Sequence, residues 1–216
     1  LDEDIYVTAL ADNTEVKLNT PQGAKASPAW SPDGSQIAYF SHTEPEEVWS
    51  LTQMHVWCAP VNGEAAFDIT PDLDRPVGDE VLCDSIPGHV SNAGPIWTDD
   101  GKRLVFLVSD QGSVQLYAAT IDTRTADPMT EGDRHIVGVI GDSSGRQLAL
   151  LMGDDANPPD IYACDVGNPV PERLTDLHKD WTDEVEIRDP ESIWYTADDG
   201  VSVQGWLLTP PDFDAE

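Results

Sequence analysis

Cysteine is scarce in this sequence, with three residues among 216, and the three show no pairing pattern. An odd number without a C-x-x-C spacing excludes a disulfide framework and gives no sign of a metal site. Cys58 and Cys164 stand among small apolar strand residues, so they are interpreted as buried thiols of a reducing cytoplasm, whereas Cys83 carries no signal of its own. Histidine forms no H-x-H or H-E-x-x-H pair, so neither a metal nor another cofactor is expected; the five histidines are His42, His55, His89, His135 and His178.

Basic residues are also scarce: Lys and Arg number 11 against 41 Asp and Glu, which gives a formal charge of −30. Nucleic acid is therefore not expected as a partner, because phosphate contacts require a basic patch. The acidic residues are spread over every loop, which favours a solvated surface adapted to high salt, where self-repulsion is screened. An acidic face that attracts cationic peptides stays open as an alternative.

Helical periodicity and long apolar runs are missing as well. No window of about a dozen residues keeps a 3.6-residue apolar period, and no run is long enough to span a bilayer. The chain starts at Leu1 without an initiator Met or a signal peptide, and it starts in the middle of a repeat. We therefore expect a cytoplasmic fragment with no membrane partner.

What the sequence does contain is a unit of strands that recurs three times, each copy marked by a tight turn. The copies run from Pro28 to Phe40 through Asp33-Gly34, from Pro95 to Leu107 through Asp100-Gly101, and, more worn, from Val137 to Leu150 through Ser144-Gly145. Asp-Gly and Ser-Gly supply the positive φ that a tight hairpin needs. Each copy therefore predicts two antiparallel strands.

The spacing of the turn glycines indicates the size of the unit. Gly34, Gly101 and Gly145 lie 67 and 44 residues apart, and the shorter interval fits a four-stranded blade. The longer interval predicts an insertion between Pro71 and Asn92, with a loop over residues 72–78 and a short apolar stretch at 81–83. Later strands also align, and each leads to a closing pair: Leu18-Asn19, Ile69-Thr70, Met129-Thr130 or Leu174-Thr175.

These patterns predict an all-β fold, a partial β-propeller of about three and a half four-stranded antiparallel blades out of an expected seven. The missing blades are expected to be N-terminal. A propeller protects its sheet edges by radial closure, which an incomplete ring lacks. The fragment is therefore expected to expose two blade faces through which it could self-associate.

Residues 141–145 match G-x-S-x-G, the nucleophile-elbow pattern of serine hydrolases. An elbow needs a strand before its serine and a helix after it. The residues after Ser143 are in register with the second strand of the other two copies, so Ser143 is interpreted as a turn residue.

A weaker pattern places Asp72 and Asp74 one residue apart, with Asp79 and Glu80 beyond, as in some calcium loops. Pro76 and Val77 stand where an EF-hand loop needs a ligand and a glycine. No calcium site is expected here.

The segment after the last repeat differs from a blade. Two strands alternate around Asp199-Gly200, and the second runs through Gln204-Gly205-Trp206-Leu207 to Pro210-Pro211. This junction strand resembles that of the prolyl oligopeptidase family of serine peptidases, most closely the acylaminoacyl-peptidase-like branch, in which it opens an α/β-hydrolase domain after an N-terminal propeller. The likeness extends to the Trp-x-x-Asp-Gly hairpins and to the loop over residues 73–78.

The resemblance implies a serine hydrolase that cleaves short or N-acylated peptides through a Ser-Asp-His triad, with a propeller that admits only small or unfolded substrates. The chain stops at Glu216, before any triad residue, so no catalytic residue can be assigned and the fragment is expected to be inactive alone. Substrate-facing residues are expected within loops such as Ser41 to Glu47 and Asp110 to Ser113.

Two regions are therefore expected: incomplete propeller blades over residues 1–187, and a junction hairpin with the first strand of a truncated hydrolase domain over residues 188–216. The expected partners are short peptide substrates and the chain's own C-terminal hydrolase domain. An alternative is a non-enzymatic Tol-type propeller that binds protein partners, which leaves the strand from Val201 to Pro211 without a purpose.

Overall fold

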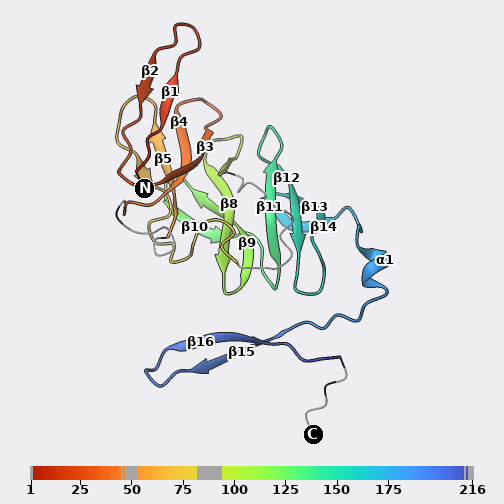
Figure 1. Ribbon diagram of the computed structural model, residues 1–216. Coiled ribbons are helices and arrows are strands. Elements are labelled where there is room, and N and C mark those ends of the chain that lie inside the picture. The colour runs from red at the N-terminus through yellow and green to blue at the C-terminus, as the bar shows by residue number, and fades with distance from the viewer. Residues whose placement is uncertain (1, 45, 47–52, 82–93, 212, 214–216) are drawn as a thin grey trace.

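The protein is described by a computed structural model that covers residues 2–44, 46, 53–81, 94–211 and 213 (Figure 1). Regular structure in this part of the chain is almost entirely β-strand, and its one helix is the single turn α1 (Lys179–Thr182). No helix in the described part is long and apolar enough to cross a membrane. The all-β prediction is confirmed.

Most strands belong to three antiparallel four-stranded units, each formed by strands that follow one another along the chain. A single parallel bridge between Val114 and His135 joins units 2 and 3 into one eight-stranded sheet. Unit 1 contains β3 (Lys25–Trp30), β4 (Gln36–Ser41), β5 (His55–Pro60) and β6 (Phe67–Asp68). Unit 2 contains β7 (Ile96–Trp97), β8 (Arg103–Asp110), β9 (Ser113–Thr120) and β10 (Thr125–Pro128). Unit 3 contains β11 (His135–Gly141), β12 (Gln147–Gly153), β13 (Asp160–Asp165) and β14 (Asn168–Arg173).

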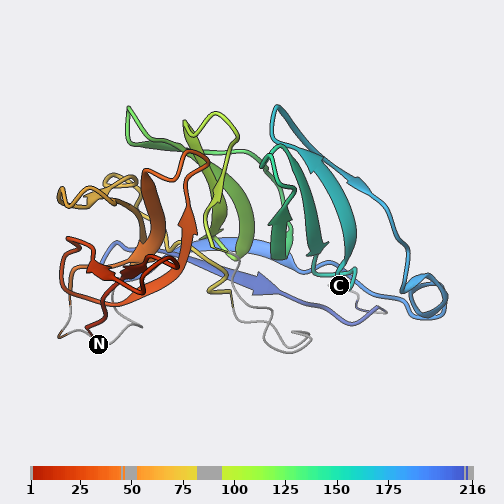
Figure 2. The same cartoon turned by 90° about the horizontal axis from the view of Figure 1, so that it is seen from above.

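Two separate hairpins flank these units. β1 (Tyr6–Thr8) pairs with β2 (Glu15–Lys17) near the N-terminus, and β15 (Glu191–Thr196) pairs with β16 (Ser202–Leu207) near the C-terminus. In Figures 1 and 2 the units stand side by side, and the β15–β16 hairpin, hereafter the junction hairpin, lies across one end of them. No sheet closes on itself within the described residues.

The three turn glycines occupy equivalent positions, as the sequence predicts. Gly34, Gly101 and Gly145 have φ values of 71°, 66° and 62°, and each donates its backbone N–H to the carbonyl three residues earlier. A residue with a β-carbon adopts this conformation at a cost, which explains the recurrence of glycine.

The third turn keeps a hydroxyl–carboxylate hydrogen bond, with the positions of the two side chains exchanged. In the second turn the Thr98 hydroxyl donates to the Asp100 carboxylate at 2.7 Å, with the carboxylate two residues after the hydroxyl. In the third, the Ser144 hydroxyl donates to the carboxylate of Asp142, two residues before it. This hydrogen bond is the largest of the causes that lower the pKa of Asp142. The third copy therefore differs from the other two in sequence because the hydroxyl and the carboxylate residues of the turn have exchanged positions.

The closing threonines secure the end of each unit. The Oγ1 atoms of Thr70, Thr130 and Thr175 each accept the backbone N–H of the residue fourteen positions earlier, at 3.0 Å in all three units. Thr70 and Thr130 are buried, and such a hydroxyl satisfies a backbone donor that would otherwise be left unpaired. The recurring Thr of the closing pairs therefore has a structural cause.

The core lies between the units rather than within one of them. One apolar cluster, which includes Phe40 and Phe106, joins units 1 and 2, and a second, which includes Leu116 and Leu150, joins units 2 and 3. A third, smaller cluster packs the β1–β2 hairpin onto unit 1. Burial of each such side chain contributes about 1.5–3 kcal/mol, so face-to-face packing provides most of the apolar stabilisation.

The predicted insertion has more structure than a loop. Val77 is buried and forms an isolated antiparallel bridge with Val108 of β8, so residues 72–78 are not all loop. Of the predicted apolar stretch at 81–83, only Val81 lies within the described residues, and Leu82 and Cys83 lie outside them.

Candidate functional site

A cavity, hereafter the large cavity, lies between the junction hairpin and unit 2. It has a volume of about 360 Å³, and its walls come from the β8–β9 turn, the segment after β10 and one face of the hairpin. Asp110, Gln111 and Ser113, which belong to one of the loops expected to face substrate, line it. A smaller cavity of about 90 Å³ adjoins it and shares Gln111, Ser113 and Gln204 with it.

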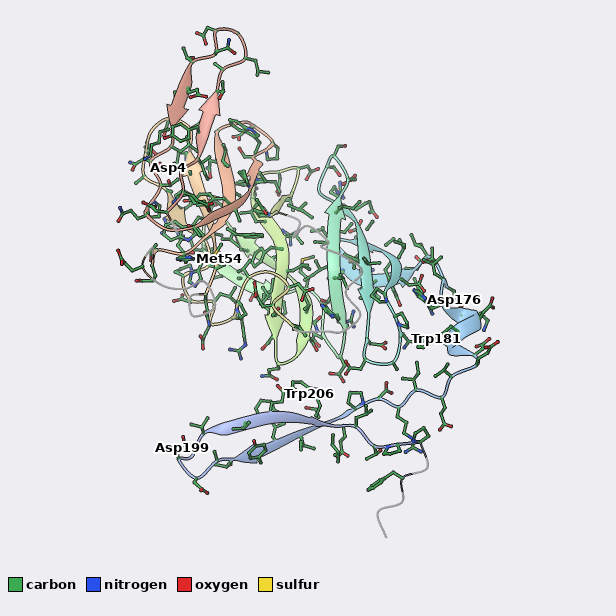
Figure 3. The ribbon with its side chains drawn as sticks, in the orientation of Figure 1. Asp4, Met54, Asp176, Trp181, Asp199 and Trp206 are labelled. Atoms are coloured by element: carbon green, nitrogen blue, oxygen red, sulfur yellow. The ribbon has the colours of Figure 1, made fainter. Side chains whose placement is uncertain are left out.

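The junction hairpin is two-faced because side chains alternate along its strands. Ser192, Trp194 and Gln204 line the large cavity, and Trp206 lines the small one. Figure 3 shows Trp206 on the side of the hairpin that faces the units, with Asp199 at the hairpin's tip. On the opposite side Ile193, Tyr195 and Leu207 are 39, 56 and 49% exposed.

Two contacts hold the hairpin against the β8–β9 turn. The Gln204 side chain donates to the Gln111 carbonyl at 3.2 Å and to the Ser192 hydroxyl at 3.2 Å. The Trp206 indole lies over Gly112, where an added β-carbon would come within 2.3 Å of the ring. Gly112 also has a φ of 84°, which residues with a β-carbon rarely adopt. The backbone conformation and the closeness of the Trp206 ring therefore both favour glycine at this position.

We expect Gly112→Ala to displace Trp206 and loosen the junction hairpin while the three units stay folded. Hydrogen exchange of the β16 amides should accelerate about tenfold or more, because a residue with a β-carbon at positive φ and a ring clash each cost about 1 kcal/mol or more. Gly132→Ala is the matched control, since Gly132 has a φ of 93° and its nearest neighbour is the end of the Arg134 side chain at 3.6 Å. Equal exchange of β16 in both variants would contradict this contact.

The cavity region is acidic and partly aromatic. Asp110, Glu131 and Asp133 line the large cavity together with Tyr117 and Trp194. Burial raises the pKa of Tyr117, and the nearby Asp110 raises it further. Carboxylates beside indole and phenol rings suit cationic or amide-bearing groups more than anions.

Carboxylates also crowd the edge of the small cavity. Burial raises the pKa of Asp155, and repulsion by Asp133, Asp154 and Asp189 raises it further. Asp155 therefore takes up a proton at a higher pH than an ordinary aspartate.

A third cavity, of about 330 Å³, lies on unit 1. Its lining includes four residues of the other loop expected to face substrate: Ser41, His42, Thr43 and Glu44. Pro45 and Glu47 of the same loop lie outside the described residues. Both loops that were expected to face substrate thus contribute to a cavity.

Ser143 does not form a nucleophile elbow. It is exposed in the turn between β11 and β12, and the residues after it form strand rather than helix. No hydrogen bond joins a serine hydroxyl to a histidine ring among the described residues that line the three cavities. These cavities thus hold no hydrogen-bonded serine–histidine pair of the kind that activates a hydroxyl.

The acidic residues of the insertion are used in other contacts. Asp74 accepts a hydrogen bond from Gln53, and Asp79 lies 2.8 Å from His135. In the part of the chain that the structure describes, no group of three or more His, Cys, Asp or Glu residues is arranged to hold a metal ion.

The histidines form two His–Asp contacts that sequence inspection missed. His55 pairs with Asp68 at 2.7 Å and His135 with Asp79 at 2.8 Å. The first joins neighbouring strands of a predicted unit and could have been found by aligning β5 with β6. The second spans 56 residues and joins the insertion to unit 3, so no local pattern marks it.

The remaining predicted residues have structural surroundings. His42 accepts the Glu44 N–H through Nδ1, and His178 precedes α1, while His89 lies outside the described residues. Cys58 and Cys164 are free and buried, and burial raises the pKa of the Cys58 thiol to about 12. Neither thiol is therefore a reactive nucleophile near neutral pH.

Two curated proteins that the chain resembles in sequence are peptidases. The chain is 27% identical over 171 residues to the uncharacterized peptidase YuxL of Bacillus subtilis, covering 79% of this chain and 26% of the relative. It is 24% identical over 214 residues to dipeptidyl-peptidase 5 of Porphyromonas gingivalis, covering 98% of this chain and 28% of that enzyme. No protein-family model matches.

Solved structures share the fold. Acylaminoacyl peptidase of Pyrococcus horikoshii superimposes with a TM-score of 0.64 at 21% identity, over 94% of this chain and 27% of that one. The putative TolB of Agrobacterium tumefaciens gives a TM-score of 0.57 at 19% identity, over 80% and 55%. This chain thus spans about a quarter of the length of the peptidases that it matches. The resemblance to peptidases drawn from the junction strand is confirmed.

Proposed function

We propose, for a chain that resembles prolyl oligopeptidase-family peptidases in sequence and fold, that these residues form the substrate-gating propeller part of a serine peptidase. The observation that carries this proposal is the two-faced junction hairpin. One face lines a cavity with the β-strand units, and large apolar side chains stay about half exposed on both faces: Trp194 and Trp206 are 52 and 48% exposed on the cavity side, and Ile193, Tyr195 and Leu207 are 39, 56 and 49% exposed on the other. Exposed apolar side chains gathered in this way are typical of an interface.

The partner that best fits these exposed side chains is the chain's own hydrolase domain. The hairpin would then contain the first strand of that domain, with the boundary near residue 188. The natural chain is expected to continue for roughly 250 residues of alternating strand and helix that carry a G-x-S-x-G elbow and the triad. On this proposal the catalytic residues lie outside residues 1–216, and these residues alone are inactive.

The proposed substrates are short or N-acylated peptides. Dipeptidyl-peptidase 5 and acylaminoacyl peptidase, which this chain resembles, are named for short or blocked N-terminal substrates. The cavity beneath the hairpin offers carboxylates and aromatic rings, which suit peptide amides and cationic groups. A propeller of seven blades, of which these units would be three, would limit entry to small or unfolded chains.

A Tol-type propeller that binds protein partners is the second candidate, supported by the fold similarity to TolB. The relatives detected by sequence are peptidases, and the match to dipeptidyl-peptidase 5 includes almost the whole chain. The peptidase proposal also gives the junction hairpin a purpose, so it accounts for more of the chain.

The proposal is tested by assaying the natural full-length protein and residues 1–216 on chromogenic acyl-amino-acid and dipeptide substrates. Turnover by the full-length protein and none by the shorter chain is expected. The Ser143→Ala variant of the full-length protein should keep wild-type activity. Loss of turnover in that variant, or no turnover by the full-length protein on any of these substrates, would contradict the proposal.

The charge of −30 is proposed to be an adaptation to a salt-rich cytoplasm, in which the surface is screened. Stability of the full-length protein should then rise with KCl concentration. If the acidic surface instead steers cationic peptides, kcat/KM for such peptides should fall steeply with salt.

A further inference from the structure

The insertion between units 1 and 2 contacts all three units. Its backbone reaches unit 1 through the Val77 N–H, which donates to the Met54 carbonyl at 3.4 Å just before β5. It reaches unit 2 through the Gly78 N–H, which donates to the Leu107 carbonyl at 2.8 Å. It reaches unit 3 through the Asp79 carboxylate, which lies 2.8 Å from His135 Nε2 at the start of β11.

Apolar side chains of the same segment enter both inter-unit cores. Val77 is 3% exposed and belongs to the cluster between units 1 and 2. Val81 packs against the cluster between units 2 and 3. Residues 77–81 thus run from one core to the next along the edge of unit 2.

Hydrogen bonds fix this path along unit 2. The Ser109 hydroxyl of β8 donates to the Gly78 carbonyl at 3.0 Å and accepts the Glu80 N–H at 2.8 Å. The Ser109 N–H donates to the Pro76 carbonyl at 3.1 Å. The segment between the two valines therefore has little freedom to shift along the strand.

The final contact of the segment is well sheltered. The side chains of His135 and Asp79 are 16 and 10% exposed, which makes their hydrogen bond stronger than an exposed one. His135 and Val81 also line the small cavity, and Trp206 of the junction hairpin lines the same cavity. The segment therefore reaches a cavity that the hairpin helps to enclose.

We infer that residues 75–81 are an inter-unit clamp, which fixes the position of unit 3 against unit 2 and thereby supports the junction hairpin above them. Units 2 and 3 also meet in a parallel bridge between Val114 and His135, where the Val114 N–H donates to the Arg134 carbonyl at 3.0 Å, so the clamp acts at the point where the two units join. Asp79 and His135 are its positioning residues. This inference does not depend on the proposed catalytic activity.

The charged surroundings of His135 sharpen the design of a test. Asp79 contacts it from the clamp and is followed by Glu80, Asp133 and Arg134 precede it in its own segment, and Asp154 and Asp155 line the same small cavity. Experiments are therefore run at constant pH and high salt, so that only the contact itself changes.

The test is hydrogen exchange of the natural full-length protein, comparing His135→Gln and Asp79→Asn with His55→Gln and Asp68→Asn. The second pair is the matched control, because His55 and Asp68 form an equally short contact, 2.7 Å, within unit 1. Clamp variants should accelerate exchange of residues 202–207 and of the Gln111–Gly112 turn by about tenfold, because a sheltered hydrogen bond to a charged group is lost. The control variants should leave these amides unchanged.

A structural role confined to unit 3 would give a different result. Faster exchange in β11 with an unchanged hairpin, or equal effects from both pairs, would overturn the inference. If His135→Gln fails to fold, Asp79→Asn, which keeps the size of the side chain but replaces its carboxylate by a carboxamide, gives the same reading. The double variant should be no worse than Asp79→Asn alone, because both changes remove one contact.

Discussion

Gly145→Ala is expected to destabilise the protein by about 3 kcal/mol, far more than the same change at the equivalent glycines of units 1 and 2. All three glycines have positive φ, so each substitution costs about 1 kcal/mol from backbone conformation. At Gly145 an added β-carbon would also lie 1.9 Å from the Trp97 carbonyl oxygen, which belongs to unit 2. Relief of that overlap requires a backbone shift at the junction of units 2 and 3, which costs about 2 kcal/mol more.

Gly34→Ala is the control for this prediction. Nothing lies within 4 Å of a β-carbon added at Gly34, so only the conformational cost applies. Urea unfolding of the two variants measures the difference. Equal losses of unfolding free energy would show that the turn of unit 3 does not press against unit 2.

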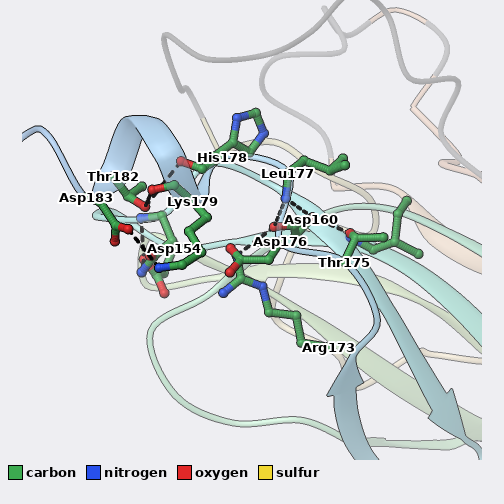
Figure 4. Close-up of polar contacts among 12 residues, drawn as sticks. Asp154, Asp160, Arg173, Thr175, Asp176, Leu177, His178, Lys179, Thr182 and Asp183 are labelled. Carbon is green, nitrogen blue, oxygen red and sulfur yellow. Dashed lines mark hydrogen bonds and ion pairs between the residues drawn. The ribbon is translucent and has the colours of Figure 1, made fainter.

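Asp160→Asn is expected to cost about 3 kcal/mol at pH 7. The Asp160 side chain is 1% exposed and accepts hydrogen bonds from Arg173 at 2.6 Å, from the Leu177 N–H at 3.2 Å and from the Thr175 hydroxyl (Figure 4). These partners are all hydrogen-bond donors. The Asn side chain replaces one acceptor oxygen by an NH2 group, which then faces one of these donors without an acceptor between them. Loss of a buried charged partner costs about 3–5 kcal/mol, and the lower value is expected because Arg173 is 40% exposed.

The control is Asp176→Asn, which removes a 2.8 Å contact with the same guanidinium. Asp176 is 49% exposed, so its loss should cost about 0.5 kcal/mol or less. Urea unfolding should therefore separate the two variants clearly. A loss at Asp160 as small as that at Asp176 would contradict the stabilising role of the hydrogen bonds that Asp160 accepts.

The destabilisation caused by Asp160→Asn should depend on pH. Burial by itself would raise the pKa of Asp160, but hydrogen bonds from Thr175 and Arg173 outweigh it and lower the pKa to about 2. A carboxylate with a lowered folded-state pKa stabilises the fold fully above its unfolded pKa of about 4. The difference between wild type and Asp160→Asn should therefore shrink as the pH falls from about 4 to about 2.

The sequence predicted the repeating parts of this fold well because their signals are local. Each Asp-Gly or Ser-Gly turn needs a positive φ, and each closing Thr caps a backbone N–H within its own unit. Such requirements recur at a fixed spacing, so alignment of the copies shows them. The number of blades in the whole protein and the hydrolase continuation stay predictions.

The insertion and the candidate site were harder to predict because their contacts join distant segments. Val77 pairs with Val108, Asp79 meets His135, and Gln204 reaches the Gln111 carbonyl 93 residues away. No spacing rule relates such positions until the units are stacked. The extra length between Gly34 and Gly101 marked the insertion, but it gave no sign that the segment bridges three units.

Ser143 shows why a short motif needs its structural context. Its pentapeptide satisfies G-x-S-x-G in sequence, whereas the structure gives it a turn between two strands. The register of residues 147–150 with the other copies was enough to reject it as an elbow.

The central claim is that residues 1–216 are a propeller part and that the reactive serine of the protein lies beyond them. The most direct test treats the natural full-length protein with a fluorophosphonate, which modifies activated serines, and locates the adduct by peptide mass spectrometry. The account predicts one modified serine, C-terminal to Glu216, within a G-x-S-x-G sequence. Modification of Ser143, or of any other serine within residues 1–216, would contradict it.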